Sequence, residues 1–440
     1  MTRRGLVSAA GLAGGGTLLA RPLSLVPTDA RAQAPDGPSP VQVLSDPVLN
    51  FQALFALGAT GEGTAEYGEV ATVIDGIRAR GSTIDAVHDE FTAMSVQLRD
   101  AARRSRAGRH RVSARDQFLR SARYLTPPLF FVLGTSDPTS ARQATDYRAM
   151  RARWNAAGRL FSPPIEQVRI PYGPGSLPGW FLRPPGPRHR RPTIVLNNGN
   201  DAQAVDIYAY GGAAALARGY NALIFEGPGQ GAMLFLRNVR MRPDWEKVIT
   251  PVVDYLRGRD DVDKRRIAAI GWSQGGELVA RALPFEHRLA AAVFDPGSVA
   301  EIAAFHLPEE LIQVVQSGDR EEANAQWDSI FPNLPETTRF EFRKGAAPFV
   351  QPDFFDLVRY VLQFQIGPDL IGRIGTPTLV TEYEDELVYP GQAQTVYDAL
   401  RSRKALRRLT AAEGAQLHDA PMAPQRRNEI VFDWLEKRLG

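Results

Sequence analysis

Residues 193–440 alternate between short apolar runs and longer segments of helical character. Runs of strand length occupy residues 193–196, 222–225, 267–270, 290–294, 378–381 and 406–410. Helix-length segments such as 204–218, 245–257 and 392–402 lie between most of them. Parallel strands need a crossover connection, which is usually a helix. This alternation therefore predicts an α/β fold, a mainly parallel sheet with helices on both faces.

The segment before this alternation is predominantly helical. Apolar residues recur at three and four spacing over 67–80, 84–105, 112–124 and 146–160, and Pro127-Pro128 ends the third of these segments. A hairpin over 167–183 leads into the sheet. We expect an N-terminal helical domain over residues 35–162 and an α/β domain over 163–440. Residues 298–373, too long for a simple crossover, predict a helical cap over the sheet edge where open α/β sheets bind ligands.

Residues 1–34 have the layout of a twin-arginine export signal. Arg3-Arg4 precede an apolar, small-residue stretch, and small residues near Ala32 and Ala34 offer cleavage sites. We favour cleavage after Ala32, because Pro35 would follow the other cut. A membrane anchor is the alternative, but the run is Gly-rich and short for a span. The prediction is a periplasmic or extracellular protein with no stable membrane anchor after cleavage.

Charge and composition exclude several classes of function. The whole chain carries a net charge of +3, and residues 1–34 supply all of it, so no basic footprint for nucleic acid remains. The chain has no Cys, which excludes a thiol nucleophile and a thiolate metal site. No His, Asp or Glu spacing indicates a metal, so we expect no metal and no cofactor. The run Arg103-Arg104-Ser105-Arg106 is interpreted as a solvated helix end.

The strongest chemical motif is Gly271-Trp272-Ser273-Gln274-Gly275, directly after a buried-type strand and before a helix. A sharp strand-to-helix turn lifts the Ser hydroxyl out of the sheet, and small neighbours let the backbone pack closely. The helix N-terminus can then supply the backbone N–H of Gln274 to a developing oxyanion. Ser273 is therefore the predicted nucleophile.

A Ser hydroxyl needs a base, and the base needs an orienting carboxylate. His418 follows the last predicted strand and precedes the last helix, so its loop lies at the same sheet edge as Ser273. Between them, the loop after the penultimate strand carries Glu384, Asp385 and Glu386. We favour Asp385 as the acid, with Asp295 as the alternative.

Two glycine-containing turns lie beside these residues. The turn 197–201 follows the first long parallel strand, and the backbone N–H of Asn200 is the expected second oxyanion donor. Residues 227–231 contain three glycines but lack the spacing of a nucleotide-binding loop. We interpret them as a tight turn beside the pocket.

Together these motifs resemble the α/β-hydrolase superfamily. The helical N-terminal half, and Phe-Glu-Gly-Pro-Gly-Gln-Gly at 225–231, resemble one subgroup. It includes the fermentation-respiration switch protein, dihydroxypseudooxynicotine hydrolase and fungal polyketide-shortening hydrolases. Several members cleave carbon–carbon bonds next to a ketone, and other relatives are esterases or peptidases. This chain departs from the common pattern at Tyr389, an extra residue before Pro390, and in a His loop that is one residue longer.

The resemblance implies a serine hydrolase in which Ser273, Asp385 and His418 act on an ester or a ketone-adjacent C–C bond of a small, apolar substrate. Glu301 and His306 in the cap are candidate substrate contacts. A peptidase-like amide hydrolase and a non-catalytic binding protein of the same fold stay as alternatives. A homodimer is left open.

Overall fold

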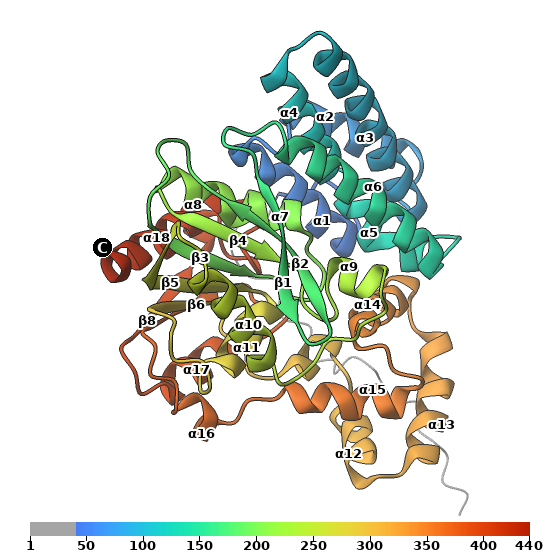
Figure 1. Ribbon diagram of the computed structural model, residues 1–440. Coiled ribbons are helices and arrows are strands. Elements are labelled where there is room, and N and C mark those ends of the chain that lie inside the picture. The colour runs from blue at the N-terminus through green and yellow to red at the C-terminus, as the bar shows by residue number, and fades with distance from the viewer. Residues whose placement is uncertain (1–40) are drawn as a thin grey trace, which may run out of the picture. The chain divides into compact units, whose positions relative to one another are not determined.

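The centre of the computed structural model, which describes residues 41–440, is an eight-stranded sheet (Figure 1). The strands lie in the order β1-β2-β4-β3-β5-β6-β7-β8. β1 and β2 form an antiparallel hairpin, β2 is antiparallel to β4, and all later neighbours are parallel. The strands are β1 Glu166–Tyr172, β2 Gly175–Leu182, β3 Arg191–Asn197, β4 Asn221–Phe225, β5 Val262–Trp272, β6 Ala291–Asp295, β7 Thr378–Tyr383 and β8 Lys404–Leu409. The expected signal peptide and its cleavage sites lie outside the described residues.

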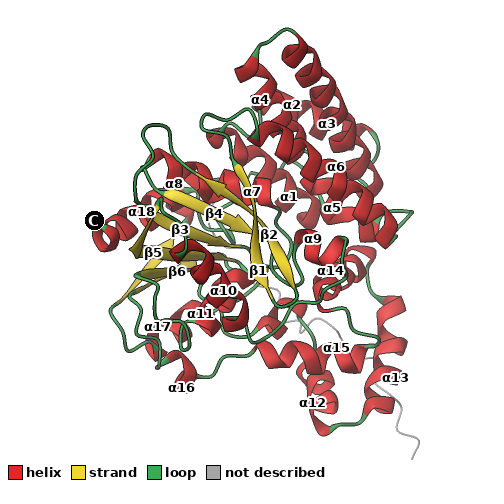
Figure 2. Ribbon diagram, in the orientation of Figure 1, coloured by secondary structure: helices red, strands yellow, loops and turns green. Residues whose placement is uncertain are grey.

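Helices cover both faces of this sheet (Figure 2). One face carries α10 (Glu246–Arg257), α11 (Gln274–Ala282) and α17 (Gln392–Ala399), which share a hydrophobic core with the strands. The opposite face carries α7 (Ala204–Ile207), α8 (Ala213–Ala217) and α18 (Pro424–Leu439), with a π-helical turn between α7 and α8. The central strands are buried on both faces, which explains their continuous apolar runs.

The N-terminal region consists of helices with a core of its own. They are α1 Pro47–Gly58, α2 Tyr67–Ala79, α3 Ile84–Ala107, α4 Arg111–Arg123, α5 Thr126–Phe131 and α6 Ser140–Gly158. The two prolines that we expected to end a helix lie in the first turn of α5, where a missing N–H costs nothing. The described residues 41–440 belong to one compact unit, so the division into two domains near residue 163 stays a prediction.

A helical insertion separates β6 from β7, as expected. It contains a short 3-10 helix Glu301–Phe305, followed by α12 Glu309–Ser317, α13 Arg320–Ile330, α14 Glu336–Ala346, α15 Phe354–Val361 and α16 Pro368–Ile371. The insertion contacts the loops that follow β3 and β4: Asn200 donates to the Gly345 carbonyl, and Met241 donates its N–H to Pro348. Phe340 of α14 also stacks on Phe131 of α5. The cap thus joins the carboxyl edge of the sheet to the N-terminal helices.

Within residues 41–440, no helix is both long and apolar enough to cross a membrane. The same part of the chain contains no group of three or more His, Cys, Asp or Glu side chains placed to hold a metal ion.

Candidate active site

Ser273 lies at a strained turn between β5 and α11. Its backbone has φ 53° and ψ −130°, a conformation that L-residues rarely adopt. The turn is held by its own backbone, because the Ser273 N–H donates to the Asp295 carbonyl at 2.7 Å. Strain of this kind persists only where the surrounding structure enforces it. The fold therefore presents the Ser273 hydroxyl at the carboxyl edge of the sheet.

Three glycines make this turn sterically feasible. A Cβ on Gly271 would lie 2.0 Å from the carbonyl oxygen of Gly275. On Gly275 it would lie 2.5 Å from the Asn197 carbonyl oxygen, and on Gly276 it would lie 2.4 Å from the carbonyl oxygen of Pro296. These contacts are all with backbone atoms, which cannot move aside as a flexible side chain could. The spacing of glycines around Ser273 is thus a packing requirement of the turn.

Ser273, His418 and Glu386 form a continuous hydrogen-bonded array. The Ser273 Oγ lies 3.0 Å from His418 Nε2. On the other side of the ring, His418 Nδ1 lies 2.9 and 2.8 Å from the two carboxylate oxygens of Glu386. Glu386 also accepts the backbone N–H groups of Val388 and Tyr389 at 2.8 and 3.1 Å. An array of this geometry can remove the proton from a hydroxyl nucleophile.

The expectation that Asp385 contacts His418 is wrong. The Asp385 N–H donates to the Gln416 carbonyl, and Asp385 forms an isolated parallel bridge with Leu417, between the loops that follow β7 and β8. This pairing fixes Asp385 in an extended conformation at the edge of the loop, where its partly exposed carboxylate makes no hydrogen bond within residues 41–440. The next residue, Glu386, lies beyond the last bridge and reaches the imidazole.

The carboxylate of Asp295, the alternative acid, contacts residues other than His418. Its carboxylate accepts the hydroxyls of Thr381 and Tyr383, each at 2.5 Å, and lies 3.6 Å from the guanidinium of Arg427. Its carbonyl holds the N–H of Ser273. Asp295 therefore links the turn at Ser273 to strand β7 and stabilises the turn.

Buried charges set the protonation of the array. Burial on its own would raise the pKa of Glu386, but the charge and hydrogen bond of His418 and two backbone N–H groups lower it. Burial opposes the charged form of His418, yet the carboxylates of Asp419 and Glu386 outweigh it and raise the pKa of the imidazole. Asp419 lies 3.6 Å from His418 Nε2, and burial raises its own pKa. Each of the two groups therefore favours the charged form of the other.

The turn after β3 lies against Ser273. A Cβ on Gly199 would meet the N atom of Gln274 at 3.0 Å and the Ser273 Cβ at 3.1 Å. The loop after β4 braces this turn, because Gln230 donates its amide to the carbonyls of Asn198 and Gly199 at 2.7 and 2.9 Å. The glycine-rich segment 227–231, expected to be a tight turn, thus fixes the neighbouring turn that carries Asn200.

Glu301, one of the two cap residues singled out, lies in a buried polar cluster beside Asn200. The Tyr389 hydroxyl donates to Glu301 at 2.6 Å, and the neighbouring Asn200 side chain favours the charged form of Glu301. Burial raises the pKa of Glu301 to about 7. Glu277, one turn after Ser273 on α11, is buried, and desolvation together with the charge of Glu301 raises its pKa well above the ordinary range.

His306, the other cap residue, is exposed at the end of the 3-10 helix Glu301–Phe305. No hydrogen bond links it to Ser273, His418 or Glu301 within the described residues. The structure therefore brings Glu301, but not His306, into the polar network of the site.

Comparison with known proteins identifies the family. Residues 205–431 match the model of the alpha/beta hydrolase family. The chain belongs to this family. The matched segment contains Ser273, Glu386 and His418, and begins after the turn that carries Asn200. The chain is therefore a hydrolase of the alpha/beta type.

Individual relatives of this alpha/beta hydrolase extend the similarity over most of the chain. Hydrolase LUC6 from Fusarium sp is 26% identical over 420 residues, covering 91% of this chain and 98% of the relative. The 20-hydroxy-prefusarin hydrolase FUS2 from Gibberella moniliformis is 27% identical over 361 residues, covering 79% and 84%. Among solved structures, 2,6-dihydroxy-pseudo-oxynicotine hydrolase superposes with a TM-score of 0.67 at 19% identity, covering 87% and 95%.

Sequence reasoning named Glu386 without favouring it, and it gave no site role to Asp419 or Tyr389. The choice of Glu386 over Asp385 depends on the isolated bridge between Asp385 and Leu417, a contact between two loops that no local pattern marks. Asp419 follows His418 directly, so its adjacency was the available signal. Tyr389, the extra residue before Pro390, donates to Glu301, a contact across 88 positions of sequence.

Proposed function

We propose that this alpha/beta hydrolase is a serine hydrolase with Ser273 as nucleophile, His418 as general base and acid, and Glu386 as the orienting carboxylate. The observation that carries the proposal is the hydrogen-bonded array, with 3.0 Å between Ser273 and His418 and 2.8 Å between His418 and Glu386. Along the chain the nucleophile Ser273 comes first, the acid Glu386 second and the base His418 last, which is the order that alpha/beta hydrolases use.

In the proposed reaction the Ser273 oxygen attacks a carbonyl carbon while His418 Nε2 takes the hydroxyl proton. The backbone N–H groups of Gln274 and Asn200 stabilise the oxyanion. When the intermediate collapses, the bond to the leaving group breaks and His418 returns the proton to it. Water, activated by the same imidazole, then releases the acid from Ser273. Glu386 stabilises the imidazolium in both steps.

The proposed substrate is a small molecule of apolar character with an ester or a ketone-adjacent C–C bond. Ester cleavage expels an alkoxide and C–C cleavage expels an enolate, and the same array serves both. Support comes from relatives named as hydrolases of 20-hydroxy-prefusarin and 2,6-dihydroxy-pseudo-oxynicotine. Glu301 is the proposed polar contact to the substrate, because it lies beside Asn200 and its pKa near 7 lets it donate or accept. The contact expected from His306 stays a prediction.

We further propose export by the twin-arginine route to the periplasm or outside the cell, on the pattern of residues 1–34. A fusion of those residues to a reporter tests this proposal. Loss of export on replacing both Arg3 and Arg4 by Lys supports it, and export that persists contradicts it.

A fluorophosphonate probe separates the enzyme from a non-catalytic protein of the same fold. We expect labelling of the wild type and none of Ser273→Ala. An unlabelled wild type, or equal labelling of Ser273→Ala, contradicts the proposal. A panel of aryl esters, aryl amides and β-diketones then assigns the bond. Turnover of esters alone removes the C–C assignment, and preferential turnover of amides removes both assignments.

A further inference from the structure

Far from Ser273 along the chain, the N-terminal helices form a groove of about 620 Å³ between α3, α4 and α6. Four arginines line it: Arg99, Arg103 and Arg106 from α3, and Arg153 from α6. Its remaining lining is apolar, consisting of Phe118 and the small side chains Ala107, Ala149, Ala152 and Ala156. The basic run that the sequence indicated to be a solvated helix end thus contributes two of its three arginines to one concave site.

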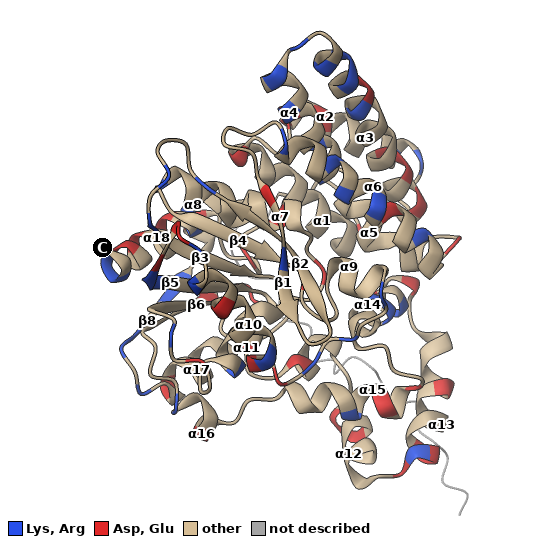
Figure 3. Ribbon diagram, in the orientation of Figure 1, with Lys and Arg blue, Asp and Glu red and all other residues tan. Residues whose placement is uncertain are grey.

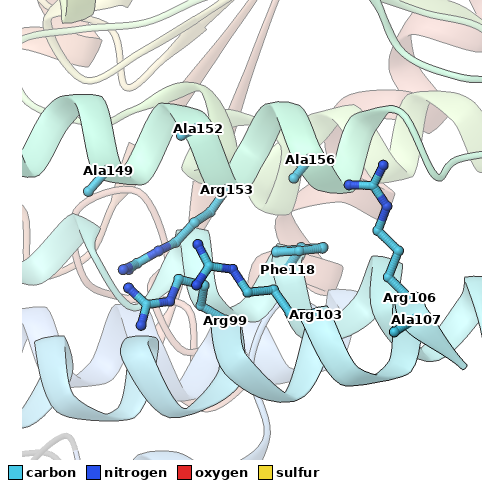
Figure 4. Close-up of a pocket in the computed structure, with 9 residues that line it drawn as sticks. All are labelled: Arg99, Arg103, Arg106, Ala107, Phe118, Ala149, Ala152, Arg153 and Ala156. Atoms are coloured by element: carbon cyan, nitrogen blue, oxygen red, sulfur yellow. The ribbon is translucent and has the colours of Figure 1, made fainter.

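Three of the four guanidinium groups gather at one end of the groove. Arg99 and Arg103 extend from α3 toward Arg153 of α6, whereas Arg106 extends at the other end, with Phe118 between (Figure 4). Blue segments, which mark Lys and Arg positions, recur along the ribbons of these N-terminal helices (Figure 3). Such an arrangement separates a cationic end from an apolar middle.

The positive charges of the groove are not balanced by the protein. Asp100 pairs with Arg99 at 2.8 Å and lies 3.5 Å from Arg103. Neither Arg106 nor Arg153 forms an ion pair with any residue of 41–440. Asp100 and Asp146, whose charges both act on Arg153, thus set two carboxylates against four guanidinium groups, and the groove carries a positive potential that attracts anions.

Arg153 is the critical member because it is buried, with 8% of its surface exposed. Its guanidinium donates to the Ser95 hydroxyl, which fixes its position. Burial, with the charges of Arg99 and Arg103, lowers the pKa of Arg153 to about 10. Buried charges in proteins are ordinarily paired, so an anion bound beside Arg153 would offset the cost of burying its charge.

We propose that this groove binds a small organic anion whose carboxylate or phosphate group lies between Arg99, Arg103 and Arg153 and whose apolar part lies along Phe118 and the alanines. Guanidinium forks match carboxylate and phosphate oxygens through paired hydrogen bonds. The alanines leave room for a chain or ring above them. This site is independent of the reaction at Ser273.

Titration of the full chain with matched probes tests the proposal. Hexyl phosphate and hexanoate carry both parts of the ligand, inorganic phosphate and acetate carry the anion alone, and hexanol carries the apolar part alone. We expect saturable binding of one hexyl anion, about 10-fold or more tighter than its short counterpart, because each buried methylene adds affinity. Added NaCl should weaken it. Which headgroup binds more tightly distinguishes a phosphate from a carboxylate ligand.

Substitutions on α3 and α6 locate the binding. Arg103→Gln should weaken the hexyl anion about 10-fold, since it removes a charged hydrogen-bond donor. Arg104→Gln is the matched control, because Arg104 is the adjacent exposed arginine and does not line the groove. Arg153→Met, checked for folding by circular dichroism, should abolish the binding.

Four results would overturn the proposal. The first three are the absence of saturable binding of either hexyl anion up to about 10 mM, equal weakening by Arg104→Gln and Arg103→Gln, and binding unchanged in folded Arg153→Met. Equal affinity for inorganic phosphate and hexyl phosphate would also overturn it, since the apolar wall would then contribute nothing.

Discussion

Replacement of Glu386 by Gln tests which carboxylate of the acidic loop serves His418. The substitution keeps the size of the side chain and leaves an amide oxygen for the N–H groups of Val388 and Tyr389. It removes the negative charge that faces the imidazole at 2.8 Å. We therefore expect a folded protein whose imidazolium is no longer stabilised during the reaction.

The size of the effect follows from the geometry. The charge centres of imidazolium and carboxylate are separated by roughly 4 Å, and their attraction at an effective dielectric constant of about 20 is about 4 kcal/mol. This corresponds to a loss of about 10³-fold in kcat, and misorientation of the ring raises it toward ~10⁴-fold. KM should change little, because Glu386 does not contact the substrate in the proposed mechanism.

The assay is steady-state hydrolysis of an aryl ester by purified wild type, Glu386→Gln and Asp385→Asn. Asp385 is the matched control, since it lies one position earlier in the same loop and contacts Gln416 through its backbone. Its substitution should leave kcat within about twofold, the range of a surface change. A larger loss for Asp385→Asn than for Glu386→Gln would refute the assignment.

Three further changes probe the surroundings of the array. Asp419→Asn removes a charge that raises the pKa of His418, so the acidic limb of kcat/KM should move to lower pH; an unmoved limb contradicts this coupling. Gln230→Met leaves two buried carbonyls without their donor and should cost about 1–3 kcal/mol in denaturant unfolding, with a lower kcat; unchanged values contradict the bracing role. Gly271→Ala should cost about 3 kcal/mol or more, whereas Gly68→Ala in α2, which meets no atom within 4 Å, should gain up to about 1 kcal/mol. Equal thermal stability of these two variants would contradict the packing argument.

The sequence predicted most of the fold because the fold depends on periodic patterns. The six expected strands all overlap observed strands, five of them to within two residues at each end, whereas β5 begins five residues earlier than expected. The helix expected over 84–105 is observed as α3 Ile84–Ala107. The role of Pro127-Pro128 was harder to predict. We expected the two prolines to end a helix, and they also lie in the first turn of the next helix, α5. Helix α17 also ends at Ala399, three residues before the expected end.

The site residues that could be predicted are those whose sequence motif also determines their position in the fold. Ser273 and His418 lie within hydrogen-bonding distance because one occupies a strand-to-helix turn and the other follows the last strand. Asp385 and Glu386 differ by one position, and a single β-bridge to Leu417 decides which of them faces the imidazole. That bridge is a tertiary contact, as is the hydrogen bond between Tyr389 and Glu301. Neither contact can be predicted from the composition of the sequence or from the spacing of its residues.

The arginine groove escaped prediction for a related reason. Arg99, Arg103 and Arg106 recur at three and four spacing on α3, which is the pattern of one helix face. Their partner Arg153 comes from α6, about fifty positions later, and only the packing of α3, α4 and α6 brings it opposite them. A run of arginines in the sequence therefore predicts a charged helix face. Whether that face lines a groove depends on how the helices pack against one another.

Rapid quench of the wild type with p-nitrophenyl acetate, followed by intact-mass and peptide analysis, tests the central claim most directly. The account predicts a transient species heavier by one acetyl group, with the modification on the peptide that contains Ser273. It also predicts that Ser273→Ala forms no such species, and that Glu386→Gln forms it far more slowly than Asp385→Asn. Turnover with no acylated intermediate, or acylation at a residue other than Ser273, would contradict the account.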